Sequence, residues 1–238
     1  GNAFEFARNA VFNAKSWQAP TRDQLKRNQF GGTFGGPIIR DRTFFFGAYQ
    51  QTIQRNILQG NLAVVPDAAQ RATASDPAIV NLLQHIPIPA SGTTVRFSRP
   101  DQQDFREITG KIDHTLSQKD RLTGRYFYDR FERNAVFEPD NFLTYSDGST
   151  IVSQNMLIHE NHVFGPTLVS DIRFNYARDA AGRGPHPNAT SVQDLGVNLP
   201  FQPSPKAIQQ IRVQNGFSFG DNPTAAFIRN NFTLSYDV

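Results

Sequence analysis

Apolar and polar side chains alternate along several stretches of the chain, which is the period of a β-strand with two unlike faces. Ahead of the turn-like residues 117–120, Ile108 and Ile112 occupy even positions, whereas Lys111 and Asp113 occupy odd ones. The same alternation resumes after that turn. The two stretches therefore predict an antiparallel hairpin with one apolar face and one polar face.

Alternation of this kind also predicts strands elsewhere in the chain. They are residues 29–35 paired with 43–50, residues 153–164 paired with 168–177, and residues 231–238. The incoming strand at 153–164 alternates least clearly, and the last run continues to the final residue, which predicts a strand cut in its middle. The earliest hairpin predicts two faces, one holding Phe30, Phe34, Phe44 and Phe46 and the other holding Phe45 and Tyr49.

The connections between these strands alternate between short and long. The short ones lie at residues 36–42, 117–120 and 165–167, and the long ones at 51–104, 132–150 and 179–226. Outer-membrane β-barrels have short turns at the periplasmic rim and longer loops outside the cell. Compact soluble domains rarely contain structureless loops longer than about 12–15 residues. The pattern therefore predicts an all-β chain that forms antiparallel transmembrane barrel wall with long extracellular loops.

Strand length supports a membrane setting. The best hairpins allow about ten to twelve residues per strand, close to the ~9–11 residues of a tilted transmembrane strand. Soluble sheets use about five or six. Within the first long loop, Asp76 followed by Pro77 and the mostly apolar residues 78–83 predicts a short capped helix outside the membrane. Residues 180–205 are rich in Pro, Gly and Asn and predict irregular chain.

Composition adds a few limits. The chain has 238 residues with 38% hydrophobic, 12% aromatic and 19% charged content, so we treat it as one domain, and its 21 Phe favour strands over helices. No apolar run of about 18 residues predicts a membrane-spanning helix. Cys is absent, which excludes thiolate chemistry, and the net charge of +3 is scattered, which does not indicate a nucleic-acid partner. The first residues do not form a signal peptide, so we expect a fragment or a mature form.

Motifs that would indicate catalysis or a bound cofactor are missing from the sequence. The glycine-rich residues 31–36 lack the following Lys-Ser or Lys-Thr and helix of a phosphate loop, and glycines that let strands bend or approach explain them better. His159 and His162 are three apart on a predicted strand, so they point to opposite faces and do not share a metal. The sequence predicts no enzyme, no catalytic residue, no cofactor and no metal site.

Five charged residues share the polar face of the best hairpin, where a barrel would turn them toward its lumen. They are Lys111, Asp113, Arg121, Arg125 and Asp129. Pairing of opposite charges across strands, or contact with a plug inside the barrel, explains them better than direct ligand binding. The residues that bind a ligand stay unassigned.

Several segments resemble TonB-dependent outer-membrane receptors of the Oar-like group. They are GNAFEFARN at residues 1–9, RNQFGGTFGGPI at 27–38, DRTFFFGAY at 41–49, KIDH at 111–114, SQKDRL at 117–122 with GRY at 124–126, and FGPTLV at 164–169. The resemblance implies a 22-stranded barrel that encloses an N-terminal plug and is energised by the TonB complex of the inner membrane. Residues 1–238 would then supply about eight strands as the N-terminal portion of that barrel. The plug, the TonB box and the other strands would lie outside them.

The resemblance predicts import of a scarce ligand such as an oligosaccharide, a peptide or a metal chelate, with the long loops at 51–104 and 179–226 setting specificity. The partners would be the outer-membrane lipid, the plug, the remaining strands and the TonB complex. Two alternatives stay open: a complete small outer-membrane barrel with an adhesive or structural role, and a secreted carbohydrate-binding β-sandwich. A small barrel requires its first and last strands to pair.

Overall fold

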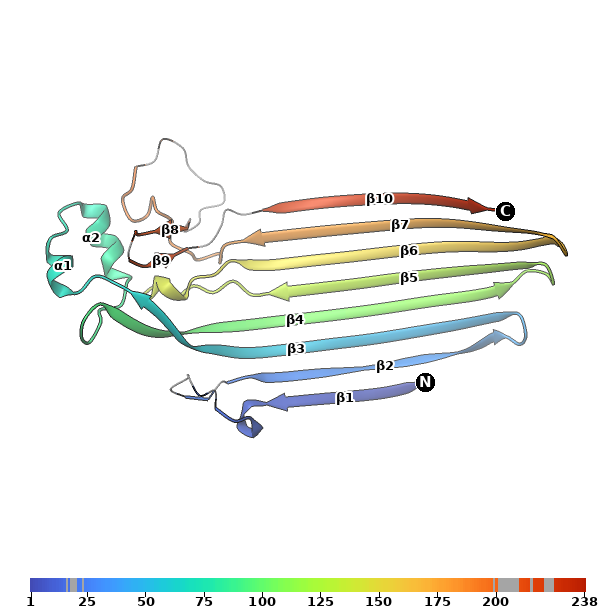
Figure 1. The fold of residues 1–238 in the computed structure, drawn as a ribbon, viewed down its shortest axis with the longest axis horizontal. Helices are drawn as coiled ribbons and strands as arrows, with labels where there is room; N and C mark the ends of the chain where they lie inside the picture. Colours follow the sequence, from blue (N-terminus) through green and yellow to red (C-terminus); the bar gives the residue numbers. More distant parts are fainter. Residues whose placement is uncertain are drawn as a thin grey trace.

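The chain forms one large antiparallel sheet, shown in Figure 1. The computed structural model describes residues 1–15, 17, 21–22, 24–198, 200, 210–214, 216–220 and 225–238. Among these residues, eight strands follow one another in the order β1-β2-β3-β4-β5-β6-β7-β10, and a second sheet contains only β8 and β9. Within the described residues, β1 pairs only with β2 and β10 only with β7, so the large sheet is open at both edges.

The strands of the large sheet differ widely in length. They are β1 Asn2–Asn9, β2 Lys26–Ile39, β3 Thr43–Val64, β4 Thr94–Thr115, β5 Asp120–Arg133, β6 Gly148–Gly165, β7 Leu168–Gly184 and β10 Ala226–Asp237. The other elements in the part of the chain that the structure describes are two short strands, β8 Ile211–Arg212 and β9 Ser218–Phe219, two α-helices, α1 Ala68–Ala72 and α2 Pro77–Gln84, and two 3₁₀ turns, Ala10–Phe12 and Phe142–Thr144.

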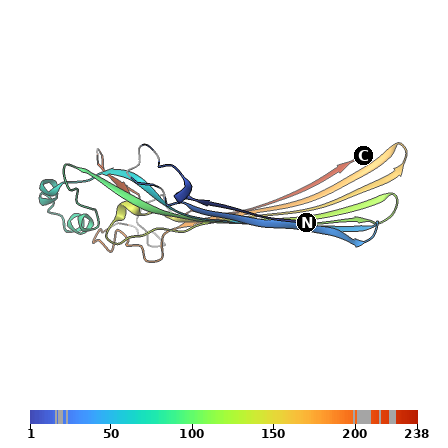
Figure 2. The ribbon, with the colours of Figure 1, turned by 90° about the horizontal axis from the view of Figure 1, so that it is seen from below.

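All three predicted short turns lie at one end of the sheet, which we call the turn end, and the long connections lie at the other, the loop end (Figure 1). Figure 2 shows that the sheet is strongly twisted along its length. The connection at 134–147 agrees with the prediction. The loop predicted at 179–226 begins later, at 185, because β7 extends to Gly184, so the irregular chain predicted at 180–205 is wrong for 180–184; residues 199 and 201–205 of that segment lie outside the described residues. A fourth long connection, residues 10–25, joins β1 to β2 at the loop end and was not anticipated.

The predicted loop at 51–104 is the main error, because its first 14 residues belong to β3 and its last 11 belong to β4. Strands β3 and β4 each have 22 residues and pair as far as Val64 and Thr94, so the true connection is residues 65–93. At about 3.3 Å per residue such strands are roughly 70 Å long, more than twice the thickness of a membrane's hydrocarbon core. The outer halves of β3 and β4 carry polar residues on both faces, so their sequence does not alternate between apolar and polar residues.

The pairing register sorts the side chains of the large sheet into two faces, since residues directly opposite each other share a face. The apolar face holds Phe34, Phe45, Tyr49, Ile108, Ile112, Tyr126, Met156, Ile158, Phe174, Tyr176, Phe232 and Leu234. The polar face holds Lys111, Asp113, Arg125, Asn155, His159, Asp171, Arg173, Asn175, Asp179, Arg229, Asn231 and Thr233. The alternation predicted for the later strands is therefore confirmed and is continuous across the sheet.

The predicted faces of the first hairpin are wrong. Phe34 lies opposite Gly47, so it shares a face with Phe45 and Tyr49 instead of Phe44 and Phe46. The rings of Phe34 and Phe45 meet with centroids 5.8 Å apart. A shift of one residue in register moves every side chain of a strand to the other face, and the register here depends on a bulge between Pro37 and Ile39.

The glycines at 31–36 lie within β2, as the strand interpretation of this segment predicted. A Cβ atom on Gly31 would lie 2.3 Å from the carbonyl oxygen of Tyr49, so only glycine permits this approach of β2 to β3. None of the described helices is long and apolar enough to cross a membrane.

Candidate functional site

The long connections fold together at the loop end into a compact body, which we call the cap. It consists of residues 65–93, 134–147, 185–198, 210–214 and 216–220. Among the described residues, every buried apolar side chain except Ala10 lies in the cap or at a strand end beside it. The cap core contains Val65, Leu82, Ile86, Val95, Phe142, Leu143, Tyr145, Leu195, Phe217 and Phe219. The protein's hydrophobic core therefore lies among its loops.

Both helices of the cap begin at an aspartate. The side chain of Asp76 accepts hydrogen bonds from the backbone N–H groups of Ala78 and Ile79, and Pro77 is the first helical residue, so the predicted helix α2 is confirmed. Helix α1 was not predicted. Its N-cap Asp67 forms a capping box with Gln70, a spacing that the sequence does show as Asp-x-x-Gln.

Arg71 of α1 ties the two helices together. Its guanidinium donates to four backbone carbonyl oxygens: those of Pro66 at 2.9 Å, Leu83 at 2.7 Å, Ile86 at 3.0 Å and Pro87 at 2.8 Å. Partial burial lowers the pKa of Arg71 from its ordinary value, because desolvation disfavours the charged form. Three of these carbonyls, those of Leu83, Ile86 and Pro87, lie at the end of α2 and in the chain that follows it, where helix geometry leaves carbonyl groups open to further partners.

Phe142 is the centre of the cap core and is fully buried. The ring of His85 stacks on it with centroids 4.4 Å apart, and the ring of Phe219 lies 6.1 Å away. His85 also bonds through Nδ1 to the carbonyl oxygen of Pro139 at 2.6 Å. Asn81 donates to the carbonyl oxygen of Leu195 at 3.2 Å, so three connections that are distant in the sequence become one packed unit.

A pocket of about 620 Å³ opens in the cap between the first and the last of these connections. Its lining residues are Val64, Val65, Pro66, Gln70, Thr73, Ala74, Ile79, Leu82, Leu83, Thr93, Val213, Gln214, Gly216 and Phe217. The described lining is mostly apolar, with two amides and two hydroxyls and no charged side chain. Sites for small molecules have this size and this composition. We call this the cap pocket.

A smaller hollow of about 290 Å³ lies on the polar face of the sheet, toward the loop end. Four glutamines line it together with Arg27, Thr52, Phe105 and Phe131; they are Gln29, Gln50, Gln54 and Gln103. Each of these side chains projects from the same face by the register of β2 to β5. The sequence did not single them out because polar residues on the outer halves of these strands show no simple period.

The five charged residues that the sequence predicted on one polar face all project from the polar face of the sheet. They are Lys111, Asp113, Arg121, Arg125 and Asp129. Lys111 forms an ion pair with Asp113 at 2.8 Å, but the two lie on the same strand, and Asp113 accepts a hydrogen bond from Thr123 across the hairpin. Directly opposite Lys111 is Arg125, so the expected pairing of opposite charges across these strands is not found there. A pair of the expected kind joins Arg229 of β10 to Asp179 of β7 at 2.9 Å.

The histidines do not form a metal centre among the described residues. His159 faces the polar side, where its Nε2 lies 2.6 Å from Asp171, and His162 faces the other side, where it bonds to Asp120. Their placement on opposite faces is as predicted. Thr43 and His114 are also bonded, at 2.7 Å, near the turn end.

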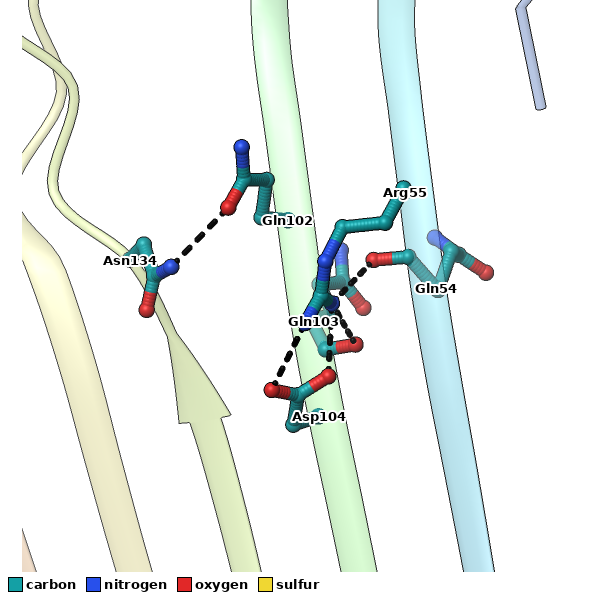
Figure 3. Close-up of polar contacts among 6 residues, drawn as sticks. All are labelled: Gln54, Arg55, Gln102, Gln103, Asp104 and Asn134. Carbon is teal, nitrogen blue, oxygen red and sulfur yellow. Dashed lines mark hydrogen bonds and ion pairs between the residues drawn. The ribbon is translucent and has the colours of Figure 1, made fainter. Parts of the chain in front are cut away.

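A polar cluster lies on β3 and β4 at the loop-end limit of the apolar face (Figure 3). Arg55 binds both oxygens of Asp104, at 2.6 and 3.0 Å, and also donates to the carbonyl oxygens of Gln54 and Gln103. A bidentate pair of this kind is short and geometrically defined. The cluster marks the level at which the apolar face ends and the segment that supports the cap begins.

One family model matches the chain. It is described as an outer membrane beta barrel domain, and it matches residues 1–79 and 72–238, which together span the whole sequence. No curated protein and no solved structure gives a significant match. The family agrees with the antiparallel sheet, its apolar and polar faces and its open edges. The chain therefore belongs to the outer membrane beta barrel domain family, and its eight long strands form part of a barrel wall in the cell outer membrane.

Proposed function

We propose that this chain is the N-terminal barrel portion of a TonB-dependent receptor that binds a scarce ligand outside the cell and imports it. The segments that resemble Oar-like receptors support this proposal, as does the barrel family. We call the eight-stranded sheet the wall. Its polar face would line the lumen, since barrels in membranes turn their apolar face to lipid. Binding and transport, rather than catalysis, are the activities that this arrangement favours.

The observation that carries the proposal is the cap pocket. Apart from Val64, its described lining comes from two connections that are more than a hundred residues apart, at 65–93 and at 213–214 with 216–217, and these belong to the two loops in which the sequence predicted specificity. Loops at this end of a barrel face the outside of the cell. A packed core beneath the pocket holds it in shape, and recognition is commonly placed on loops that a rigid scaffold positions.

The lining of the cap pocket indicates the kind of ligand. Apolar side chains form most of it, and Gln70, Thr73, Thr93 and Gln214 add groups able to form hydrogen bonds. An oligosaccharide, a peptide or a metal chelate presents both apolar and hydrogen-bonding surface. The amide-rich hollow on the polar face would then receive the ligand deeper in the lumen, through its four glutamines and two phenylalanines.

The partners follow from the same proposal. The open edges at β1 and β10 expose backbone groups that further strands of the same barrel would pair, since unpaired backbone groups are costly in lipid. A plug within the barrel would contact the charged side chains of the polar face. The TonB complex would supply energy through a segment outside residues 1–238.

Uptake by whole cells tests the proposal. Cells with and without the complete receptor are given a labelled maltodextrin, a labelled oligopeptide and a ferric chelate, each too large for porins. We expect one of the three to accumulate only when the receptor is present, and a protonophore to abolish that accumulation. Ala74→Trp should reduce it at least tenfold, because the indole would occupy the cap pocket.

The matched control is Ala90→Trp, which adds the same side chain at an exposed position of the same connection outside this pocket. Accumulation that survives the protonophore would contradict TonB-dependent import. If none of the three compounds accumulates, the import function is wrong and an adhesive or structural role takes its place. If both tryptophan variants are equally impaired, the cap pocket is not the binding site.

A further inference from the structure

The apolar face of the wall contains a hollow of about 640 Å³ that the proposed import function does not use. Glycines form its floor, with Gly47 opposite Gly110 on β3 and β4 and Gly124 on β5. A Cβ atom on Gly110 or Gly124 would meet nothing within 4 Å, so the space above both is open. Its apolar sides are formed by Phe34, Phe45, Tyr49, Ile112, Tyr126 and Ile158.

The position of this hollow restricts what can fill it. It lies on the face that a barrel of this family turns to the hydrocarbon of the membrane. Water has no hydrogen-bonding partner there, and its transfer into such a place is unfavourable. An acyl chain of a membrane lipid has the chemistry and the shape to occupy an apolar groove of this kind.

Two arginines lie on the same face just beyond the hollow, toward the loop end. Arg106 follows Ile108 on that face of β4, and Arg130 lies directly opposite it on β5. Like charges directly opposite each other destabilise a sheet. Arg130 contacts Glu132 at 2.5 Å, whereas Arg106 has no hydrogen bond or ion pair with any described residue. Arg106 therefore has no carboxylate partner among the described residues, whereas Arg130 has Glu132.

The neighbouring carboxylate does not pair with Arg106. Asp104 lies two residues from Arg106 on the same face, but both of its oxygens are bound by Arg55 (Figure 3). A third cation, Arg178 of β7, shares this face and has no ion pair among the described residues. Arginine matches phosphate well because its planar group offers several donors, and basic side chains at a membrane surface attract anionic lipid.

We propose that the outer surface of β3 to β6 is a binding site for one anionic phospholipid-like molecule of the outer leaflet. Its phosphate lies between Arg106 and Arg130, and one acyl chain runs down into the hollow over Gly110 and Gly124. The loop end faces outward, so the headgroup lies at the outer membrane surface and the chain points toward the middle of the bilayer. The bound lipid neutralises Arg106, gives Arg130 a second anionic partner beside Glu132 and fills the groove at the same time.

Native mass spectrometry of the complete protein tests the site. The protein is purified from membranes and reconstituted in nanodiscs of equal parts phosphatidylcholine and phosphatidylglycerol, and the lipids retained after release are counted. We expect the unmodified protein to retain phosphatidylglycerol in preference. The double variant Arg106→Gln with Arg130→Gln should lower that preference about tenfold. Gly110→Leu with Gly124→Leu should reduce retention of both lipids.

Matched controls separate the site from general effects of charge and size. Arg125→Gln removes an arginine from the polar face of β5, and Gly182→Leu adds a side chain to open space on β7. Both should retain lipid like the unmodified protein. Because Gly110 and Gly124 have open space above them, the leucine variants are expected to fold, which the shift of the unheated barrel on a gel verifies.

Three results would overturn the proposal. The first is equal retention by the unmodified protein and the arginine variant. The second is loss of lipid in the Arg125→Gln control to the same extent. The third is displacement of the lipid by millimolar inorganic phosphate, which would show a site for free phosphate in place of a lipid. None of these readouts depends on ligand import, so the inference and the proposed function can fail separately.

Discussion

The wall and the cap use apolar side chains in opposite ways. In the cap, Phe142 is completely buried and is surrounded by other apolar residues, as in a soluble protein. In the wall, Phe232 is 70% exposed and Leu234 is 74% exposed, although both belong to a regular strand. The difference teaches that each region is built for its own solvent. The wall needs lipid to cover its apolar face, whereas the cap covers its own apolar side chains and can face water.

The cap and the wall also differ in how their backbone hydrogen-bonding groups are satisfied. In the cap, Arg71 and the two capping aspartates satisfy backbone groups that loops and helix ends leave open. In the wall, the strand ladder satisfies the backbone, and polar side chains are free to line one face. A substitution should therefore affect the two regions through different mechanisms.

The largest expected effect is loss of the cap core. Phe142→Ala removes a fully buried ring and should destabilise the cap by about 3–5 kcal/mol, while the wall remains folded. Amide hydrogen exchange of residues 65–93 should rise strongly, and the gel shift of the unheated barrel should stay unchanged. Leu234→Ala on the exposed apolar face is the control and should change neither reading. Parallel loss of wall and cap would show that the two regions are not independent.

A charge on the apolar face gives the next largest effect. Phe174→Arg places a cation in the middle of the lipid-facing band and should cost roughly 2–4 kcal/mol. Asn175→Arg is the matched control, because the next residue of β7 faces the polar side. Unfolding by urea in lipid vesicles measures both variants. Equal costs for the two substitutions would contradict the assignment of faces.

The smallest expected effect concerns a helix cap. Asp76→Ala removes the side chain that accepts from Ala78 and Ile79 and should destabilise α2 by about 1 kcal/mol. Faster exchange of the first amides of α2 should report it, with no change in the strands. The exposed Asp140, which caps neither α-helix, provides Asp140→Ala as a control. An unchanged exchange rate in Asp76→Ala would show that Pro77 and packing alone hold the start of the helix.

The sequence pattern predicted the faces of a strand correctly where one face is apolar and the other is polar. The alternation at residues 105–129 and 168–177 gave the correct faces, and Asp76 with Pro77 gave the correct start of α2. The pattern failed in the first hairpin, where a bulge shifts the register, and in the outer halves of β3 and β4, where polar residues lie on both faces. In both places the local sequence lacks the signal, because pairing with neighbouring strands decides the outcome.

The candidate sites show the same division. The sequence indicated that the loops at 51–104 and 179–226 would carry recognition, but it gave no means of knowing that residues 65–93 meet residues 213–214 and 216–217 at one pocket. Likewise, Arg106 and Arg130 are unremarkable in the sequence, and only the register places them opposite each other beside a hollow.

The sequence by itself determined that the chain is built of antiparallel strands with one apolar face, because that information repeats every two residues and needs no distant contact. The tertiary structure decided how far the strands extend, which faces the first hairpin presents and how the long connections pack into a cap. Those features depend on contacts between residues far apart in the chain, such as Asn81 with Leu195 and Phe142 with Phe219. The stability of these features comes from burial of apolar surface between segments, which no single segment can achieve alone.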